Sequence, residues 1–223
     1  MASKIKVGII CGSGLGDSLS KTFNCSRTTN RENAKNDFGY PSSDLYHGCI
    51  DGVDIVLLAR KGTFYDGTSA KYSGVCHLPM EPAFDPRTSE ILLQAAKKLG
   101  YNIRKGGTII TIEGPRFSSK AESNALRLWG GHLVNMTICP EVFLAKEAGI
   151  LYAAIAMATD YDCWRECEDN VHAADVLVVF KQNVDKITNV LLEAVKLIDC
   201  GDWEQDIFKL KNLIESSNVT VKK

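Results

Sequence analysis

The sequence predicts an α/β fold. Segments with strand and helix character alternate along the 223 residues, and 45% of the residues are hydrophobic, which suffices for a substantial core. No repeat, linker or low-complexity segment breaks this alternation. We therefore expect one domain over residues 1–215, followed by a polar tail at 216–223.

The first part of the chain is expected to form strands. The apolar segment 5–10 predicts a buried strand that ends at the glycine-rich turn 12–14. The segments 46–50 and 53–59 flank Asp51–Gly52, and an Asp-Gly dipeptide between two strand-like segments indicates a hairpin.

Helix-start signals mark the rest of the chain. Asp85 is suited to cap a helix and Pro86 to occupy its first turn, and Gly100 ends the apolar stripe that follows. Ser119 and Glu122 have the spacing of a capping box. The other elements are expected in this order: a strand at 107–112, a helix at 119–130, a strand at 133–135, a helix at 140–148, a strand at 151–158, and helices at 173–198 and 206–214.

The composition argues against several classes of partner. A formal net charge of −1 lacks the basic surplus of a nucleic-acid binder. No apolar run approaches the roughly 20 residues that a membrane span needs, and the first residues lack the features of a signal peptide. We expect a cytoplasmic protein that binds small molecules, with the nucleus left open as a second compartment.

The eight cysteines do not suggest a metal site or a disulfide framework. They include no Cys-x-x-Cys pair, and the one close pair, Cys163 and Cys167, lacks the second pair that a zinc ribbon needs. Several of the eight lie in apolar, strand-like segments. We expect reduced thiols and no bound metal.

Asp160 and Asp162 are the strongest candidates for chemistry. They follow the apolar segment 151–158, and the period of a strand places alternate residues on the same side of the chain. Two carboxylates there can accept hydrogen bonds from the N–H groups of a heterocycle, or donate a proton if one is held neutral. The alternative is that they cap the next turn or face solvent.

Two further segments are suited to bind phosphate. The turn around Ser13 has small residues, so that backbone N–H groups can approach an anion, and the serine adds a hydroxyl donor. Arg60 ends a predicted strand, and its guanidinium can bind phosphate through two parallel hydrogen bonds. The alternatives are a plain tight turn and a surface arginine.

Five segments, in this order, resemble the S-methyl-5'-thioadenosine phosphorylases of the trimeric purine nucleoside phosphorylase family: Lys6–Leu15, Thr111–Ser119, Asn135–Thr137, Cys139–Val142 and Ala156–Trp164. The resemblance covers nearly the whole chain. It implies the nucleoside phosphorylase fold, with a mixed central β-sheet flanked by helices. It also implies phosphorolysis of methylthioadenosine to adenine and 5-methylthioribose 1-phosphate, with inorganic phosphate as co-substrate, no metal or organic cofactor, and a homotrimer.

The resemblance assigns residues to the phosphate and to the neighbouring subunit. In the family, the hydroxyls matching Ser13 and Thr137 bind phosphate, and so does an Arg-His pair that corresponds to Arg60 and Lys61. Lysine supplies positive charge but cannot act as a neutral donor and acceptor, as histidine can. Residues matching His77 and Leu177 reach a neighbouring subunit's pocket.

The resemblance also assigns residues to the nucleoside. It implies that Phe117 stacks on the purine, that Ser118 lies at the base pocket, and that Met136 contacts the ribose. By themselves, Phe117 and Met136 are equally typical of a hydrophobic core.

Asp160, Asp162 and Ala173 bear on the choice of nucleoside. A carboxylate at Asp162 can accept from the N6 amino group of adenine, and a proton shared between Asp160 and N7 would stabilise the departing base. The 6-oxopurine branch of the family has Asn at the position of Asp162 and His at that of Ala173. The small side chain of Ala173 leaves room for a methylthio group. If the correspondence with the family shifts by one residue, His172 takes this position instead.

The chain departs from the family at one place. The family carries about sixty more residues between the segments 57–60 and 64–67, and these should include a strand and a phosphate-contacting loop. The alternatives to an active enzyme are a catalytically impaired variant and a non-catalytic subunit of a mixed trimer. A 6-oxopurine nucleoside phosphorylase is the third interpretation.

Overall fold

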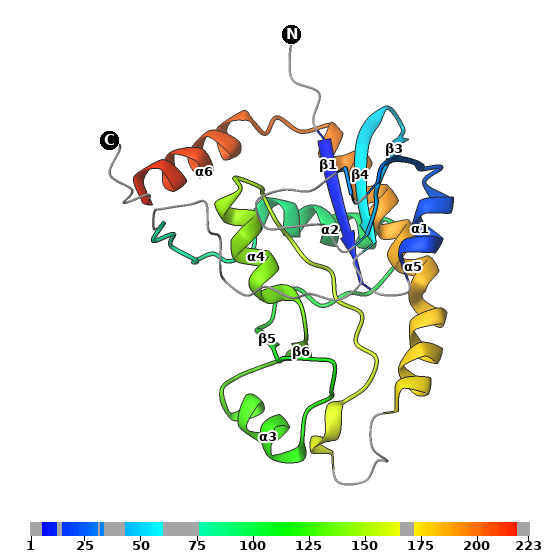
Figure 1. The fold of residues 1–223 in the computed structure, drawn as a ribbon, viewed down its shortest axis with the longest axis vertical. Helices are drawn as coiled ribbons and strands as arrows, with labels where there is room; N and C mark the ends of the chain where they lie inside the picture. Colours follow the sequence, from blue (N-terminus) through cyan, green and yellow to red (C-terminus); the bar gives the residue numbers. More distant parts are fainter. Residues whose placement is uncertain are drawn as a thin grey trace. The chain divides into compact units, whose positions relative to one another are not determined.

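The structure is a computed structural model that describes residues 6–12, 15–30, 32–33, 43–59, 76–165 and 172–217. The chain divides into two compact units (Figure 1). One contains the described residues up to Met80 and those from Val190 onward, and the other spans Glu81–Asn189. Each unit is described by itself below.

The first unit contains a mixed four-stranded sheet (Figure 1). Its strands are β1 (Lys6–Cys11), β2 (Ser26–Thr29), β3 (Leu45–Ile50) and β4 (Val53–Ala59), in the order β1-β4-β3-β2. β1 pairs with β4 in parallel, whereas β3 pairs with both β2 and β4 in antiparallel fashion. Asp51 and Gly52 have φ values of 49° and 90°, which an Asp-Gly hairpin turn requires. The predicted hairpin is confirmed.

The core of this unit lies on one face of the sheet. Burial alternates along β4, so that Val53, Ile55 and Leu57 point to the same side, where each is at most 1% exposed. Leu19 from helix α1 (Gly16–Thr22) and Val195 pack into the same cluster. Burying each such side chain stabilises the fold by about 1.5–3 kcal/mol.

The second unit contains two well-capped helices. In α2 (Pro86–Lys98), the carboxylate of Asp85 accepts from the Thr88 N–H at 2.7 Å, as the cap position predicts. The chain leaves this helix through Gly100, whose φ of 74° favours glycine. In α3 (Lys120–Leu128), Ser119 and Glu122 form the predicted capping box.

The remaining elements are short strands and long helices. β5 (Ile109–Thr111) and β6 (Leu133–Asn135) pair in parallel as a separate two-stranded sheet. α4 (Ile138–Glu147), α5 (Ala173–Asp199) and α6 (Glu204–Ser217) agree in place with the predicted helices. α6 ends at Ser217, three residues beyond the predicted end, so the first two residues of the predicted tail are helical. The mixed sheet is confirmed by the four strands of the first unit, whereas β5 and β6 form a second, separate sheet in the described residues.

The predicted strand at 151–158 is wrong. These residues form no strand, and Figure 1 draws them as an irregular connection after α4. A strand exists only where a neighbour completes its hydrogen-bond ladder. The two-stranded sheet of β5 and β6 supplies no such neighbour, and one carbonyl of the segment, that of Tyr152, instead accepts from the Asp85 N–H at 2.7 Å.

Two expectations from composition can be compared with the described part of the chain. No helix there is long and apolar enough to cross a membrane. The seven cysteines in the described residues form no disulfide bond with one another, and Cys167 lies outside those residues.

Candidate functional site

The loop that carries Phe117 and Ser118 is fixed by a fork-shaped ion pair. Two guanidinium nitrogens of Arg116 donate to the two carboxylate oxygens of Glu122, each at 2.6 Å. Glu122 also accepts from the backbone N–H of Ser119 at 2.8 Å. These bonds lower the pKa of Glu122 from 4.5 to about 2, and the bond from Arg116 has the largest effect. The loop is thereby tied to the first turn of α3.

The two aspartates lie together, but not as alternate residues of a strand. Asp162 begins the 3₁₀ turn Asp162–Trp164, and its backbone N–H donates to the carboxylate of Asp160 at 2.8 Å. The hydroxyl of Thr159 donates to the other oxygen of Asp160 at 2.7 Å. Asp160 therefore caps the turn, as the simpler alternative predicts. The backbone of Asp162 has a φ of 58°. Residues other than glycine rarely adopt this left-handed conformation, and those that do are often at functional positions.

A thiol joins the turn of the aspartates to the loop at Ser118. The sulfur of Cys163 donates to the backbone oxygen of Ser118 at 3.1 Å, although 45 residues separate them in the sequence. Burial, and then the neighbouring charge of Asp162, raise the pKa of the Cys163 thiol, so it remains protonated and able to donate. No pattern in the sequence indicates this contact.

Two oxygen atoms at this junction are buried without a partner in the described structure. One is the Oδ2 atom of Asp162 and the other is the hydroxyl of Ser118. Nearly all buried polar atoms in proteins have a hydrogen-bond partner, because an unsatisfied one costs about 1–3 kcal/mol. An acceptor and a hydroxyl left unsatisfied on two joined loops mark a place where a ligand with polar edges would bind.

Aromatic contacts hold the same two segments together. The guanidinium of Arg127, near the end of α3, lies 3.8 Å from the centre of the Trp164 ring. The ring of Tyr161 meets Trp164 edge to face at 6.4 Å between centroids, and Arg165 lies over Tyr161 at 4.2 Å. The sequence analysis missed these residues, because no local spacing relates a helix end to a turn 37 residues further on.

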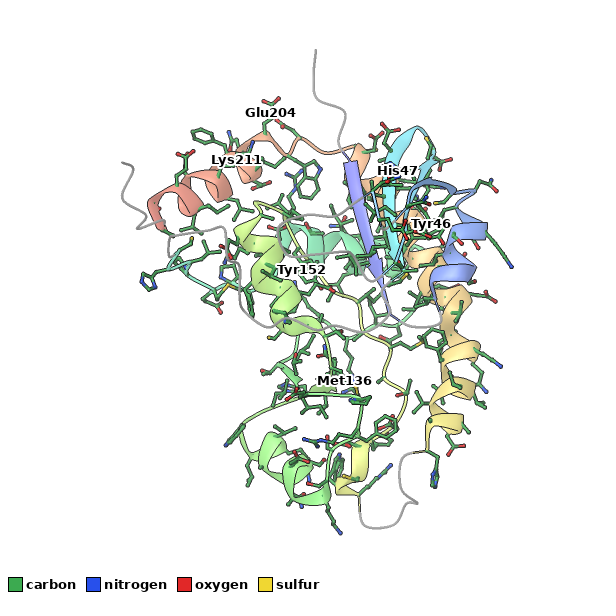
Figure 2. All side chains as sticks on the ribbon, viewed as in Figure 1. Tyr46, His47, Met136, Tyr152, Glu204 and Lys211 are labelled. Carbon is green, nitrogen blue, oxygen red and sulfur yellow. The ribbon has the colours of Figure 1, made fainter. Side chains whose placement is uncertain are left out.

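Met136 and Thr137 lie next to the loop. Met136 follows β6 directly (Figure 2), and a Cβ atom placed on Gly114 would come within 2.7 Å of its sulfur. The thioether therefore occupies the space that glycine leaves at the base of the loop. Thr137 is the N-cap residue of α4, yet its side chain makes no capping hydrogen bond.

The other predicted residues take no part in the contacts described above. Ala173 and Leu177 lie exposed on the first turns of α5, with Leu177 55% exposed. His77 is exposed in the first unit, where its backbone N–H donates to Ser217 at 2.9 Å. His172, which directly precedes Ala173, is also exposed. The predicted phosphate ligands Ser13, Arg60 and Lys61 lie outside the described residues.

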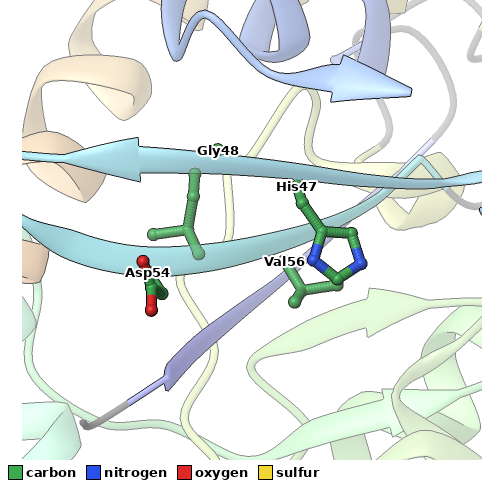
Figure 3. Close-up of a pocket in the computed structure, with 5 residues that line it drawn as sticks. His47, Gly48, Asp54 and Val56 are labelled. Carbon is green, nitrogen blue, oxygen red and sulfur yellow. The ribbon is translucent and has the colours of Figure 1, made fainter. Parts of the chain in front are cut away.

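The most evident hollows contain none of the predicted residues. One, of about 140 Å³, lies over β3 and β4, where His47 stands opposite Val56 and Asp54 contributes to the lining (Figure 3). By the register of the hairpin, these side chains are on the face of the sheet away from Val53, Ile55 and Leu57. The other hollow, of about 410 Å³, is open and runs along α3 past Arg127 and Leu128.

Comparisons with known proteins identify the family of the chain. Residues 53–196 match the phosphorylase superfamily. A protein of Anopheles gambiae named S-methyl-5'-thioadenosine phosphorylase is 42% identical over 277 aligned positions, covering 97% of this chain and 98% of that protein. Because 277 exceeds the 223 residues of this chain, the relative contains residues that this chain lacks.

Solved structures show the same fold. The methylthioadenosine phosphorylase of Schistosoma mansoni in complex with adenine superposes with a TM-score of 0.83 at 32% identity, covering 97% of this chain and 99% of that one. A single-substitution mutant of the adenosine/methylthioadenosine phosphorylase from the same organism, in complex with methylthioadenosine, superposes with a TM-score of 0.82 at 31% identity over the same shares. The chain therefore belongs to the phosphorylase superfamily and, within it, to the family of the S-methyl-5'-thioadenosine phosphorylases.

Proposed function

We propose that this chain catalyses the phosphorolysis of S-methyl-5'-thioadenosine to adenine and S-methyl-5-thioribose 1-phosphate. The observation that carries the proposal is the pair of buried, unpartnered oxygens of Asp162 and Ser118. A 6-aminopurine presents an amino group that donates and ring nitrogens that accept. The carboxylate oxygen suits the first and the serine hydroxyl suits the second. Adenine and methylthioadenosine are also the ligands of the similar Schistosoma mansoni proteins.

The reaction replaces one bond at the anomeric carbon by another. An oxygen of phosphate forms a bond to that carbon as the bond to N9 of the purine breaks, through an oxocarbenium-like state. A proton shared between Asp160 and N7 stabilises the electron pair that departs with the base. Phe117 stacks on the purine, and Met136 contacts the ribose. Phosphate is bound by Thr137 and by Ser13, Arg60 and Lys61, which lie outside the described residues.

The test compares the parent chain with Asp162→Asn. The parent should release adenine from methylthioadenosine, and only when phosphate is present. An amide can donate to the O6 atom of hypoxanthine but offers adenine a poorer acceptor. The substitution should therefore shift the ratio of adenosine to inosine cleavage by about tenfold or more toward inosine. Chromatography of the released bases measures both rates.

Asp185→Asn is the matched control, because this exposed aspartate lies in the middle of α5, away from the two loops. It should leave the ratio unchanged. A parent that releases no adenine would favour the non-catalytic interpretation, for which the residues lacking relative to the Anopheles gambiae protein provide the motive. An active parent whose ratio does not respond to Asp162→Asn would show that Asp162 does not face the base.

We also propose that three chains assemble around the sites. Leu177 and its neighbour Val178 are more than half exposed, and a solvent-facing apolar pair on a helix is typical of an interface. Sedimentation at micromolar concentration should give about three times the 24.5 kDa mass of the chain. Leu177→Glu should dissociate the assembly, whereas Lys209→Glu, on the exposed side of α6, should not. A parent that sediments only as a monomer would contradict the assembly.

A further inference from the structure

Helix α4 begins in an unusual way. The first N–H groups of a helix have no partner within it, and an N-cap threonine ordinarily accepts from one of them through its own hydroxyl. Thr137 directly precedes α4 but does not do so, and the regular turns of the helix begin only after Cys139, whose φ of −96° and ψ of 125° are extended. Instead, the side-chain oxygen of Asn135 accepts from the N–H groups of Thr137 and Ile138, at 3.2 Å and 3.4 Å.

A second threonine completes this arrangement from the neighbouring strand. The hydroxyl of Thr111, the last residue of β5, donates to the side-chain oxygen of Asn135 at 2.9 Å and accepts from the N–H of Cys139 at 3.1 Å. Thr111 and Asn135 are also paired in the register of the two strands. The backbone oxygen of Asn135 accepts from the N–H of Ile112 at 2.9 Å. The ends of both strands are therefore fastened to the start of α4.

These bonds enclose the segment that carries Met136 and Thr137. On one side, Met136 fills the space over Gly114. On the other, Asn135 and Thr111 satisfy the backbone that the Thr137 hydroxyl would otherwise have to satisfy. A hydroxyl relieved of capping can direct its hydrogen bonds to a ligand instead. The N–H groups of residues 137–139 are thus satisfied by Asn135 and Thr111 rather than by the Thr137 hydroxyl.

We propose that Thr111 and Asn135 are positioning residues for the phosphate and sugar side of the site. They act through the backbone of residues 136–139 and leave the Thr137 hydroxyl available to phosphate. This inference rests on the function proposed above. It adds that the precision of phosphate binding depends on a hydroxyl that itself contacts no substrate.

Thr111→Val tests the proposal, because valine keeps the shape of threonine and removes both hydroxyl bonds. We expect KM for phosphate to rise about tenfold or more, while the dissociation constant for adenine, measured by calorimetry, stays within about twofold. Thr111→Ser, which keeps the hydroxyl, should restore the parent's values. A merely structural role would instead weaken adenine and phosphate binding together, and would lower the melting temperature in parallel.

The matched control is Thr188→Val. Thr188 is a buried threonine of the same unit, whose hydroxyl donates to the Val184 oxygen at 2.9 Å on α5, and it should leave KM for phosphate unchanged. If Thr111→Val does not fold, Thr111→Ala removes the same hydroxyl without the branched side chain and takes its place. An unchanged KM for phosphate in a folded variant would overturn the proposal, and so would equal weakening of all ligands.

Calorimetry also separates this proposal from the proposed function. If the parent releases no adenine, the proposed function fails, and titration of inorganic phosphate into the parent and the Thr111 variants still decides the positioning role. Phosphate binding by the parent that weakens about tenfold in Thr111→Val and returns in Thr111→Ser supports it. A parent that binds no phosphate overturns it.

Discussion

Restoring the family's additional residues after Arg60 should increase the turnover of methylthioadenosine by about 10²- to 10³-fold. The segment would be taken from the Anopheles gambiae relative, whose alignment with this chain spans more positions than the chain has residues. In the family, the residues near Arg60 contact phosphate, and loss of one preorganised charge-stabilising contact commonly costs this much. Release of adenine at saturating phosphate would be followed for both chains.

A glycine-serine linker of the same length, inserted at the same point, is the control. It should leave turnover at the level of the 223-residue chain, because it adds neither a strand nor side chains for phosphate. The restored chain should also melt at a higher temperature, since strands regain neighbours and apolar surface is buried. Equal turnover by the short and restored chains would mean that Lys61 and its surroundings rebuild the phosphate site.

The second large effect is expected from Asp160→Asn, which should lower kcat for methylthioadenosine by about 10²- to 10⁴-fold. An amide has no acidic proton to share with N7, so the departing base loses its main stabilisation. The fold of the turn should survive, because the amide oxygen can still accept from the N–H of Asp162, as the carboxylate does at 2.8 Å. The measurement is the single-turnover rate of adenine release.

Thr159→Val separates proton donation from the geometry of the turn. It removes the 2.7 Å hydrogen bond to the other oxygen of Asp160 but keeps the carboxyl group. Its effect on kcat should be within about tenfold. If Asp160→Asn retains the parent's rate, Asp160 serves only to cap the turn and another group must assist the leaving purine.

The elements that could be predicted from the sequence are those whose signals are local. The Asp-Gly turn, the Asp85 cap and the Ser119–Glu122 capping box each depend on residues within a few positions of one another, and all three are present. The strand predicted at 151–158 failed because an apolar pattern cannot show whether a partner strand exists. α1 and β2 were not predicted, because seven and four residues are too few to show a clear periodic pattern of hydrophobic residues.

The residues assigned to the candidate site stay a prediction, and the contacts that hold them together could not be predicted from the sequence. Phe117, Ser118, Asp160 and Asp162 lie on two segments that the structure joins, but the joining contacts come from Cys163 and from the Arg127–Trp164 pair. Both contacts connect residues far apart in the sequence, and a single sequence carries no record of such pairings. The contact between Asn135 and Thr111 was hidden for the same reason, because it joins residues 24 positions apart.

The two roles of Glu122 affect how the loop that carries Phe117 and Ser118 can move. One carboxylate both closes the capping box of α3 and grips Arg116, so the loop cannot open without uncapping the helix. We therefore expect loop and helix to behave as a single cooperative unit, whose amide hydrogens exchange together. Because the pKa of Glu122 is lowered to about 2, this coupling is complete above pH 4.5 and is lost only as the pH falls toward 2. A substrate that orders the loop would thus also stiffen a helix that it does not touch.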